Sequence, residues 1–205
     1  MVIDYKVVRS EGTYRHQVGL CRFFADVREI ESEEEGKEFL EEMKKKYPNA
    51  NHHCWAWRLG VGKDKIFRYS DDGEPSQTAG MPILTAIDHR ELTNTMIVVS
   101  RIYGGVNQGV GGLIRAYHGA ASGVLTEVGS KTVTVYEDIE IPCRYDQLGF
   151  VLRELEKIKG KVKDMVYDVD VVVKARIRPV DFDNFKENLY ENSNGTIVVA
   201  WENAQ

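Results

Sequence analysis

The residues best suited to chemistry lie in one short string, "SDDGEPSQTAGMP", in which three carboxylates surround a glycine: Asp71, Asp72 and Glu74. Asp, Gly and Pro are turn-forming residues, so the string predicts a turn at the surface. Carboxylates this close oppose one another's ionisation, and a nearby cation, metal ion or array of hydrogen-bond donors would relieve that repulsion. An ordinary turn with solvated acids is the alternative interpretation.

Glycines dominate a second string, "SRIYGGVNQGVGGLIRAYHGAASGVL", which joins a predicted strand to a predicted helix. The string has neither the Gly-Lys-Ser/Thr ending of a phosphate-binding loop nor the Gly-x-Gly-x-x-Gly spacing of a dinucleotide-binding fold. A helix that starts after glycines nevertheless exposes free N–H groups and a partial positive charge, which suit an anion. We therefore predict an anion- or nucleic-acid-binding site formed by Arg101, Gly104, Gly105, Gly111, Gly112 and Arg115.

These glycines also have a purely structural interpretation. The loop glycines from Gly104 to Gly112 can simply turn the chain, and we expect Gly119 and Gly123 to let the helix pack closely on a sheet. Arg101 and Arg115 are the basic residues available to the three carboxylates, so the acidic turn and the glycine-rich turn are predicted to lie side by side.

A third string, "NHHCWAW", contains two histidines and a cysteine. Strand alternation places His52 and Cys54 on one face and His53 on the other, and no second His/Cys pair follows at ligand spacing. We expect packed side chains here, and we predict no metal site and no cofactor. No serine lies in a nucleophile elbow, so no catalytic residue is assigned.

Composition bounds the class of protein. The chain has 205 residues, a formal net charge of −5 and three widely spaced cysteines. It contains no apolar run of the roughly 20 residues that cross a bilayer, and its start carries charges where a signal peptide needs an apolar core. We expect a cytoplasmic protein with reduced thiols and no membrane partner. Any contact with nucleic acid must come from a local basic surface, because the chain as a whole is acidic.

The elements that position these residues follow from periodicity. A capped helix is expected in "SEEEGKEFLEEMKKKYP", strands in "HHCWAWRLGV" and "KIFRYS", and a helix from about residue 82. The continuous apolar run of "NTMIVVSRIY" predicts a buried strand, and a helix is expected from about residue 111 to 128. We place a domain boundary at Gly129–Ser130, which gives domains 1–129 and 130–205.

The second domain shows the order β-α-β-β-α-β, which is typical of a ferredoxin-like fold. In its string "VDVVVKARIRP", alternation places an apolar face from Val169 to Ile177 against the helices. Lys174, Arg176 and Arg178 take the opposite face, which such a fold leaves open, so they are predicted to contact RNA. A solvated face, or one covered by the first domain, is the alternative.

Three strings carry a resemblance to a known family: "ANHHCWAW", "SDDGEPSQTAGMPIL" and "RIYGGVNQGVGGLIRAYHGAA". They resemble the signature of the IMPACT (YigZ-type) family, with Gln77 where glycine is usual, Ile102-Tyr103 where Tyr-Phe is usual and Gln108 where leucine is common. The resemblance implies an α+β protein whose first domain is of the ribosomal-protein type, similar to domain IV of elongation factor G, and whose second domain is ferredoxin-like. Eukaryotic relatives regulate translation in amino-acid starvation by competing for the activator of a starvation-sensing kinase.

Three functions are open at this point. The first is a translation-associated regulator that acts by binding RNA or the ribosome, and it is the one we expect. The second is an enzyme that acts on a phosphorylated or nucleotide substrate at residues 104 to 115, with Asp71 or Asp72 as acid or base. The third is a regulator that binds a protein partner in translation control and contacts no nucleic acid.

Overall fold

The computed structural model of the chain describes residues 4–105 and 108–201. It divides into two compact units, residues 5–133 and residues 134 onward, the second together with Asp4. The elements of the first unit are β1 (Asp4–Val8), β2 (Gly12–Val18), β3 (Cys21–Glu29), α1 (Glu33–Lys46), β4 (His52–Leu59), η1 (Gly62–Asp64), β5 (Ile66–Ser70), α2 (Gly80–His89), β6 (Thr95–Ile102), α3 (Gly109–Val128) and β7 (Ser130–Thr134).

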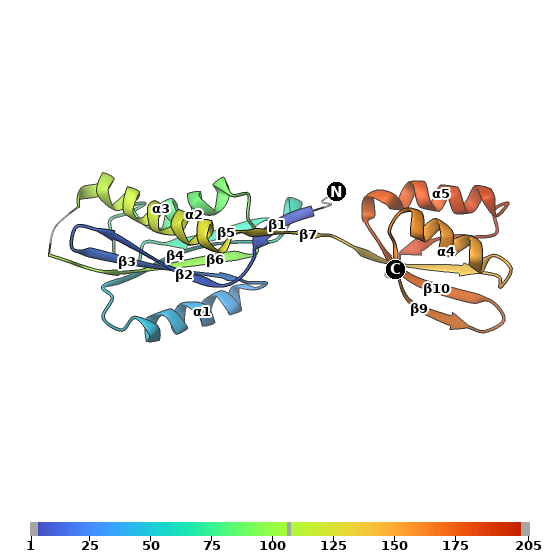
Figure 1. Ribbon diagram of the computed structural model, residues 1–205, viewed down its shortest axis with the longest axis horizontal. Helices are drawn as coiled ribbons and strands as arrows, with labels where there is room; N and C mark the ends of the chain where they lie inside the picture. The colour runs from blue at the N-terminus through green and yellow to red at the C-terminus, as the bar shows by residue number, and fades with distance from the viewer. Residues whose placement is uncertain (1–3, 106–107, 202–205) are drawn as a thin grey trace. The chain divides into compact units, whose positions relative to one another are not determined.

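A five-stranded antiparallel sheet in the order β2-β3-β6-β4-β5 forms the centre of the first unit. Helices α2 and α3 cover one face of this sheet, and α1 covers the other (Figure 1). The predicted buried strand is β6, the middle strand. Its Ile97 and Val99 join the core under α2 and α3, whereas Met96 and Val98 join the core under α1. Burial on both faces explains why the apolar run is continuous.

Helix α1 begins as its sequence predicts. The N-cap Ser32 accepts a hydrogen bond from Glu35 N at 3.2 Å, and the Glu35 carboxylate accepts one from Glu31 N at 2.8 Å. Acids occupy the first turn and lysines the last, which complements the helix dipole. The buried face of the helix carries Phe39 and Met43 to the sheet.

Helix α3 lies very close to β2. A Cβ built on Gly123 would lie 2.2 Å from the Tyr14 ring, and one built on Gly119 would lie 3.2 Å from His16. The expectation that these two glycines allow close packing is therefore confirmed. This contact fixes the axis of α3 across β2 and β3 and so determines where the start of the helix lies.

The second unit contains β8 (Glu137–Cys143), α4 (Leu148–Lys157), β9 (Lys161–Tyr167), β10 (Val171–Ile177), η2 (Pro179–Asp181), α5 (Phe182–Asn192) and β11 (Ala200–Trp201). Its antiparallel sheet has the order β11-β8-β10-β9, and α4 and α5 lie on the same face of it (Figure 1). Val171 and Val173 of β10 pack in one core with Leu155 of α4 and Phe185 of α5.

Two details differ from the expectations drawn from sequence. Val169, expected on the apolar face, is 87 % exposed, because it lies in the turn that precedes β10. Strand β7 pairs with β1, so residues 130–133 lie in the first compact unit rather than the second. The division at residues 129 and 130 remains a prediction from sequence. Across the described parts of the chain, every helix is too short or too polar to span a bilayer.

Candidate functional site

The three carboxylates of the acidic turn have three different roles. Asp71 lies at the start of α2. Its Oδ1 accepts hydrogen bonds from Ala79 N and Gly80 N at 2.9 and 2.8 Å, and its Oδ2 accepts one from Gln77 N at 2.8 Å. Free N–H groups and the positive end of a helix dipole stabilise a carboxylate in this position. Asp71 is thus a structural cap for α2.

Asp72 connects the turn to β4. Its Oδ2 accepts a hydrogen bond from His53 N at 2.6 Å, and its φ angle of 44° lies in the left-handed region that Asp tolerates. The backbone oxygen of Asp72 lies 2.8 Å from His52 Nδ1. A carbonyl oxygen only accepts hydrogen bonds, so Nδ1 carries a proton and the Nε2 atom of His52 is the one free to act on a ligand.

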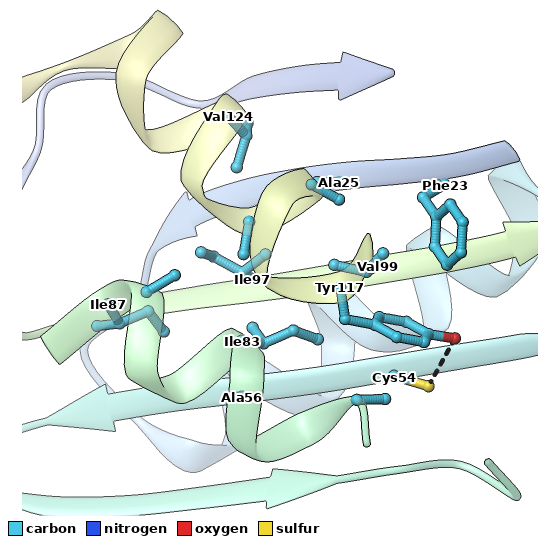
Figure 2. Close-up of a cluster of buried hydrophobic side chains, with 14 of the residues drawn as sticks. Phe23, Ala25, Cys54, Ala56, Ile83, Ile87, Ile97, Val99, Tyr117 and Val124 are labelled. Atoms are coloured by element: carbon cyan, nitrogen blue, oxygen red, sulfur yellow. Dashed lines mark hydrogen bonds between the residues drawn. The ribbon is translucent and has the colours of Figure 1, made fainter. Parts of the chain in front are cut away.

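Glu74 turns inward and forms the centre of a buried network. Its Oε1 accepts hydrogen bonds from Arg101 NH1 at 2.5 Å and from the Tyr117 hydroxyl at 2.7 Å. His52 Nε2 lies 4.0 Å from the same oxygen. The Tyr117 hydroxyl oxygen lies 3.3 Å from Cys54 Sγ, and this contact is drawn in Figure 2, where the Tyr117 ring of α3 lies over β4.

The protonation of this network follows from burial. Burial, the neighbouring Cys54 and the charge of Glu74 raise the pKa of Tyr117 far above its usual range. Burial and the nearby carboxylates likewise raise the pKa of Cys54. Burial lowers the pKa of Arg101, but its hydrogen bonds to Glu74 and Cys21 and the charge of Glu74 raise it overall. At neutral pH the phenol and the thiol are neutral, so neither Tyr117 nor Cys54 is an activated nucleophile.

A cavity of about 540 Å³ opens beside the network. Its wall combines the acidic turn, the end of β6 and the start of α3, so the two turns lie side by side as the sequence predicts. The wall is formed by Asn51, His52, Glu74, Pro75, Arg101, Tyr103, Gln108, Gly109, Val110 and Leu113. A cavity of this size suits one small ligand.

The start of α3 is open toward this cavity. Its N-cap is Gln108, whose side chain makes no capping hydrogen bond within the described chain, and Gly109 and Val110 lie in the wall. The first N–H groups of a helix have no partner inside the helix, so they are available to an anion. The sequence predicts the free N–H groups near Gly111 and Gly112, whereas the helix begins two residues earlier than Gly111, at Gly109.

Gly104 and Gly105 differ from the predicted role. The N–H group of Gly104 already donates to Cys21 Sγ at 3.4 Å, and a Cβ at this position would lie 2.2 Å from the Leu20 backbone. Gly104 therefore serves close packing against the β2–β3 turn. Gly105 has a φ angle of 86°, which glycine adopts at little cost, so it turns the chain.

Arg115 lies apart from Arg101. It contributes to a separate depression of about 500 Å³ between α2 and α3, together with Gln77, Met81, Ile114 and His118 among others. Helix α3 turns its side chains through 100° per residue, so a residue six positions after the helix start need not face the first-turn cavity. The structure thus brings Glu74 and Arg101 together and leaves Arg115 outside this site.

The open face of the second unit is ion-paired. Lys174 Nζ lies 2.9 Å from Glu140, Arg176 Nε lies 2.9 Å from Asp138, and Arg178 Nε lies 2.7 Å from Asp181. The hydrogen bonds from Arg176 and Lys163 lower the pKa of Asp138 to about 2. The sequence does not predict these cross-strand acids, because the register of β8 against β10 is set by the fold.

The sequence predicts no role at this cavity for three residues of its wall, His52, Tyr103 and Gln108. Nor does it predict the hydrogen bond that Tyr117 donates to Glu74. Strand alternation predicts that His52 shares a face of β4 with Cys54, and both side chains contact backbone oxygens of the acidic turn. The sequence does not indicate that this face ends at a cavity. Tyr117 follows Leu113 by four positions on the buried face of α3, a spacing that would have identified its inward direction.

Fold and site together define a class: an α+β protein of two units, the first of which holds a ligand-sized cavity walled by a buried carboxylate–guanidinium pair and an uncapped helix start. Residues 20–125 match the Impact N-terminal domain, and residues 141–196 match a domain of unknown function, DUF1949. The chain belongs to the IMPACT family.

Two relatives support this assignment, and a solved structure shares the fold. The chain is 32 % identical to IMPACT family member YvyE of Bacillus subtilis, over 95 % of this chain and 89 % of YvyE. It is 30 % identical to IMPACT family member YigZ of Escherichia coli, over 90 % of this chain and 91 % of YigZ. A crystal structure described as that of a hypothetical protein matches with a TM-score of 0.68 and 27 % identity, over the whole of both chains.

Proposed function

We propose that this protein is a translation-associated regulator that acts by binding RNA, either free or within the ribosome. Membership of the IMPACT family supports a role linked to translation. The observation that carries the choice of RNA is the open start of α3, which lies in a cavity wall with a buried arginine. Free N–H groups at a helix start bind phosphate, and phosphate is the feature that every RNA presents.

The domain architecture is part of the same proposal. We infer that the first unit is of the ribosomal-protein type, similar to domain IV of elongation factor G, and that the second is ferredoxin-like, similar to the last domain of that factor. The sheet order β11-β8-β10-β9 with α4 and α5 on one face supports the second inference. Domains that resemble those of a ribosome-bound factor are suited to a ribosomal partner, and the cytoplasm is where that partner resides.

We propose the open face of the second unit, with its ion pairs, as a second RNA contact. Lys174, Arg176 and Arg178 can each exchange a carboxylate partner for a phosphate. Exchange of a carboxylate for a phosphate is only weakly favourable while Asp138 and Glu140 remain beside the basic side chains. We therefore assign the cavity the larger share of binding.

The test is RNA binding by the full chain over a series of salt concentrations, with Val110 as the site of substitution. Val110 is 58 % exposed in the first turn of α3, so V110E is compatible with the fold and places a negative charge where we expect a phosphate. V110E is expected to weaken binding of a single-stranded RNA about tenfold or more at low salt and to reduce the salt slope by about one unit. V110Q, an uncharged change at the same site, should weaken binding much less than V110E, and V169E, a charged change in the exposed turn before β10, should match the wild type.

Two outcomes would contradict the proposal. In the first, the full chain binds no RNA at low salt and does not sediment with ribosomes. In the second, a protein partner is retained at unit stoichiometry after nuclease treatment and neither RNA nor ribosomes are bound, which would favour the protein-binding regulator.

An enzymatic role is the second candidate, and one contact favours it. His52 is held by the Asp72 carbonyl at Nδ1 and presents Nε2 to the cavity, 4.0 Å from Glu74 Oε1. A histidine oriented in this way is suited to proton transfer. For this candidate we propose His52, rather than Asp71 or Asp72, as the acid or base, because both aspartates already cap or tether the backbone. Incubation with phosphorylated compounds, comparing wild type and H52Q by mass spectrometry, tests this candidate.

A further inference from the structure

Two residues in the wall of the cavity beside Glu74 each hold a buried polar atom without a hydrogen-bond partner among the described residues. Arg101 is only 5 % exposed, and its Nε has no hydrogen-bond partner among the described residues. Its NH1 donates to Glu74, and its NH2 lies 3.7 Å from Cys21 Sγ. A buried donor without a partner costs free energy, so a ligand that accepts from Nε binds more favourably here than at an exposed arginine.

A second such atom accepts hydrogen bonds. Gln108 Oε1 is buried and lacks a partner within the described chain, whereas Gln108 Nε2 donates to Val18 O at 3.2 Å. That donation fixes which end of the amide is the oxygen. His52 Nε2 and the Glu74 carboxylate are further acceptors in the same wall. The site therefore offers acceptors to a ligand that carries N–H groups.

The wall also has an aromatic and apolar part. Tyr103 is 43 % exposed and its ring packs over the Arg101 guanidinium, with 5.4 Å between the ring centroid and Cζ. Val110 and Leu113 of α3 add aliphatic surface. An exposed aromatic ring can stack on the flat face of a base, whereas inorganic phosphate has no flat face to stack.

We propose that this cavity binds a single nucleoside monophosphate group, with the phosphate at the start of α3 and the base against Tyr103 and the acceptors. The inference rests on the proposed function and names the part of the RNA that enters the first unit. A cavity of about 540 Å³ admits one nucleotide. The acceptors favour bases with an exocyclic amino group, which are adenine, cytosine and guanine, over uracil.

The ligand has two sources with the same chemistry, a free mononucleotide and the phosphorylated end of an RNA. Nε and Oε1 are buried, so the ligand must shift a side chain of the wall to reach them. We therefore expect micromolar to millimolar dissociation constants.

The experiment is calorimetric titration of the full chain with AMP, CMP, GMP, UMP, adenosine and inorganic phosphate. AMP, CMP and GMP are expected to bind at least tenfold more tightly than adenosine or inorganic phosphate, and more tightly than UMP. Y103A should weaken AMP about fivefold or more and leave inorganic phosphate unchanged, whereas Y103F should restore AMP binding. V110E should weaken both ligands, and V169E neither.

Competition separates the two sources. If the end of an RNA is the ligand, a 5′- or 3′-phosphorylated oligonucleotide binds more tightly than its hydroxyl form and AMP displaces it. If a free mononucleotide is the ligand, AMP binds and oligonucleotides do not compete with it. Mononucleotides that bind no better than inorganic phosphate, or that are insensitive to Y103A, would overturn the inference. RNA binding that survives that result would leave the proposed function standing, because RNA would then contact the protein elsewhere.

Discussion

Glu74 and Arg101 form an ion pair that is almost completely withdrawn from water: 2.5 Å separates Oε1 from NH1, and the two side chains are 4 % and 6 % exposed. One residue comes from a turn and the other from the central strand, so the pair joins two segments that are distant in sequence. A buried pair of this kind contributes little net stability while intact, because both charges lose their hydration. Removing one partner, however, leaves the other charged and unpaired.

The first prediction concerns that asymmetry. E74A is expected to reduce the free energy of unfolding by about 3–5 kcal/mol, because it leaves the Arg101 charge uncompensated and the Tyr117 hydroxyl without its acceptor. E74Q should cost less, since it keeps an acceptor for Tyr117. Urea unfolding of each variant measures the effect. E91Q, which removes an exposed pair with Lys6, serves as control and should change stability much less than E74A, because water screens the pair. A loss in E74A no larger than that in E91Q would show that the pair is not structural.

The second prediction concerns the cap of α2. D71A removes the acceptor of three backbone N–H groups and is expected to cost about 2 kcal/mol. D71N, which keeps one acceptor oxygen, should recover part of that loss. D64A alters an acid of the short helix η1 and is the matched control. Equal unfolding midpoints for D71A and D64A would contradict the capping role.

The sequence predicts the helices and strands around this site better than the side-chain atoms that would contact a ligand. The spacing of apolar residues predicts β6, α1 and α3, because in each element it follows which side chains are buried. The acidic turn stands out in the sequence, yet which carboxylate turns inward depends on Arg101 and Tyr117, the partners of Glu74, which are distant in sequence. Arg115 and Arg101 are close along the chain, but α3 places Arg115 at the separate depression between α2 and α3.

The third prediction compares two glycines of α3. G123A is expected to destabilise the protein by about 1–2 kcal/mol, because its methyl group would lie 2.2 Å from the Tyr14 ring. G111A has the same advantage in helix propensity without that clash, since its Cβ meets only the end of the Arg115 side chain at 3.4 Å. It should stabilise the protein by up to about 1 kcal/mol. Thermal unfolding of the two variants should therefore shift in opposite directions, and shifts of the same sign would contradict the packing account.

The fourth prediction concerns mild acid. Burial lowers the pKa of His16, His53 and His118, and the neighbouring His89 contributes for His118. Each folded-state pKa lies below the unfolded value of about 6.5, so the unfolded chain binds more protons as the pH falls through that value. Stability should be constant above about pH 7.5 and decline from about pH 6.5 toward about pH 5.

Urea midpoints of W201F measure this decline in the first unit, because the remaining tryptophans, Trp55 and Trp57, both lie there. H118Q should reduce the dependence on pH, whereas H89Q removes only a minor neighbour and should reduce it less. A midpoint that rises on acidification would exclude this explanation.

The fifth prediction concerns the open face of the second unit, where acidic side chains form ion pairs with the basic ones. Replacing the acidic residues tests RNA binding by this face more sharply than replacing the basic residues. D138N with E140Q deprives Arg176 and Lys174 of the carboxylates that lie 2.9 Å away, and the cost in stability is small because these pairs are partly exposed. If the face contacts RNA, the double variant should bind RNA more tightly than the wild type. Its salt slope should steepen by up to about one unit for each additional phosphate that the face binds.

Replacing Lys174, Arg176 and Arg178 with alanine should have the opposite effect on both quantities, because it removes the cations that a phosphate would meet on this face. The affinity for RNA should fall and the salt slope should flatten. V110E provides the comparison, since it acts on the first unit and leaves the open face of the second unit intact. The contrary result is that neither D138N with E140Q nor the triple alanine variant changes the affinity or the salt slope, while V110E still weakens binding. RNA would then contact this protein at the start of α3 and not at the open face of the second unit.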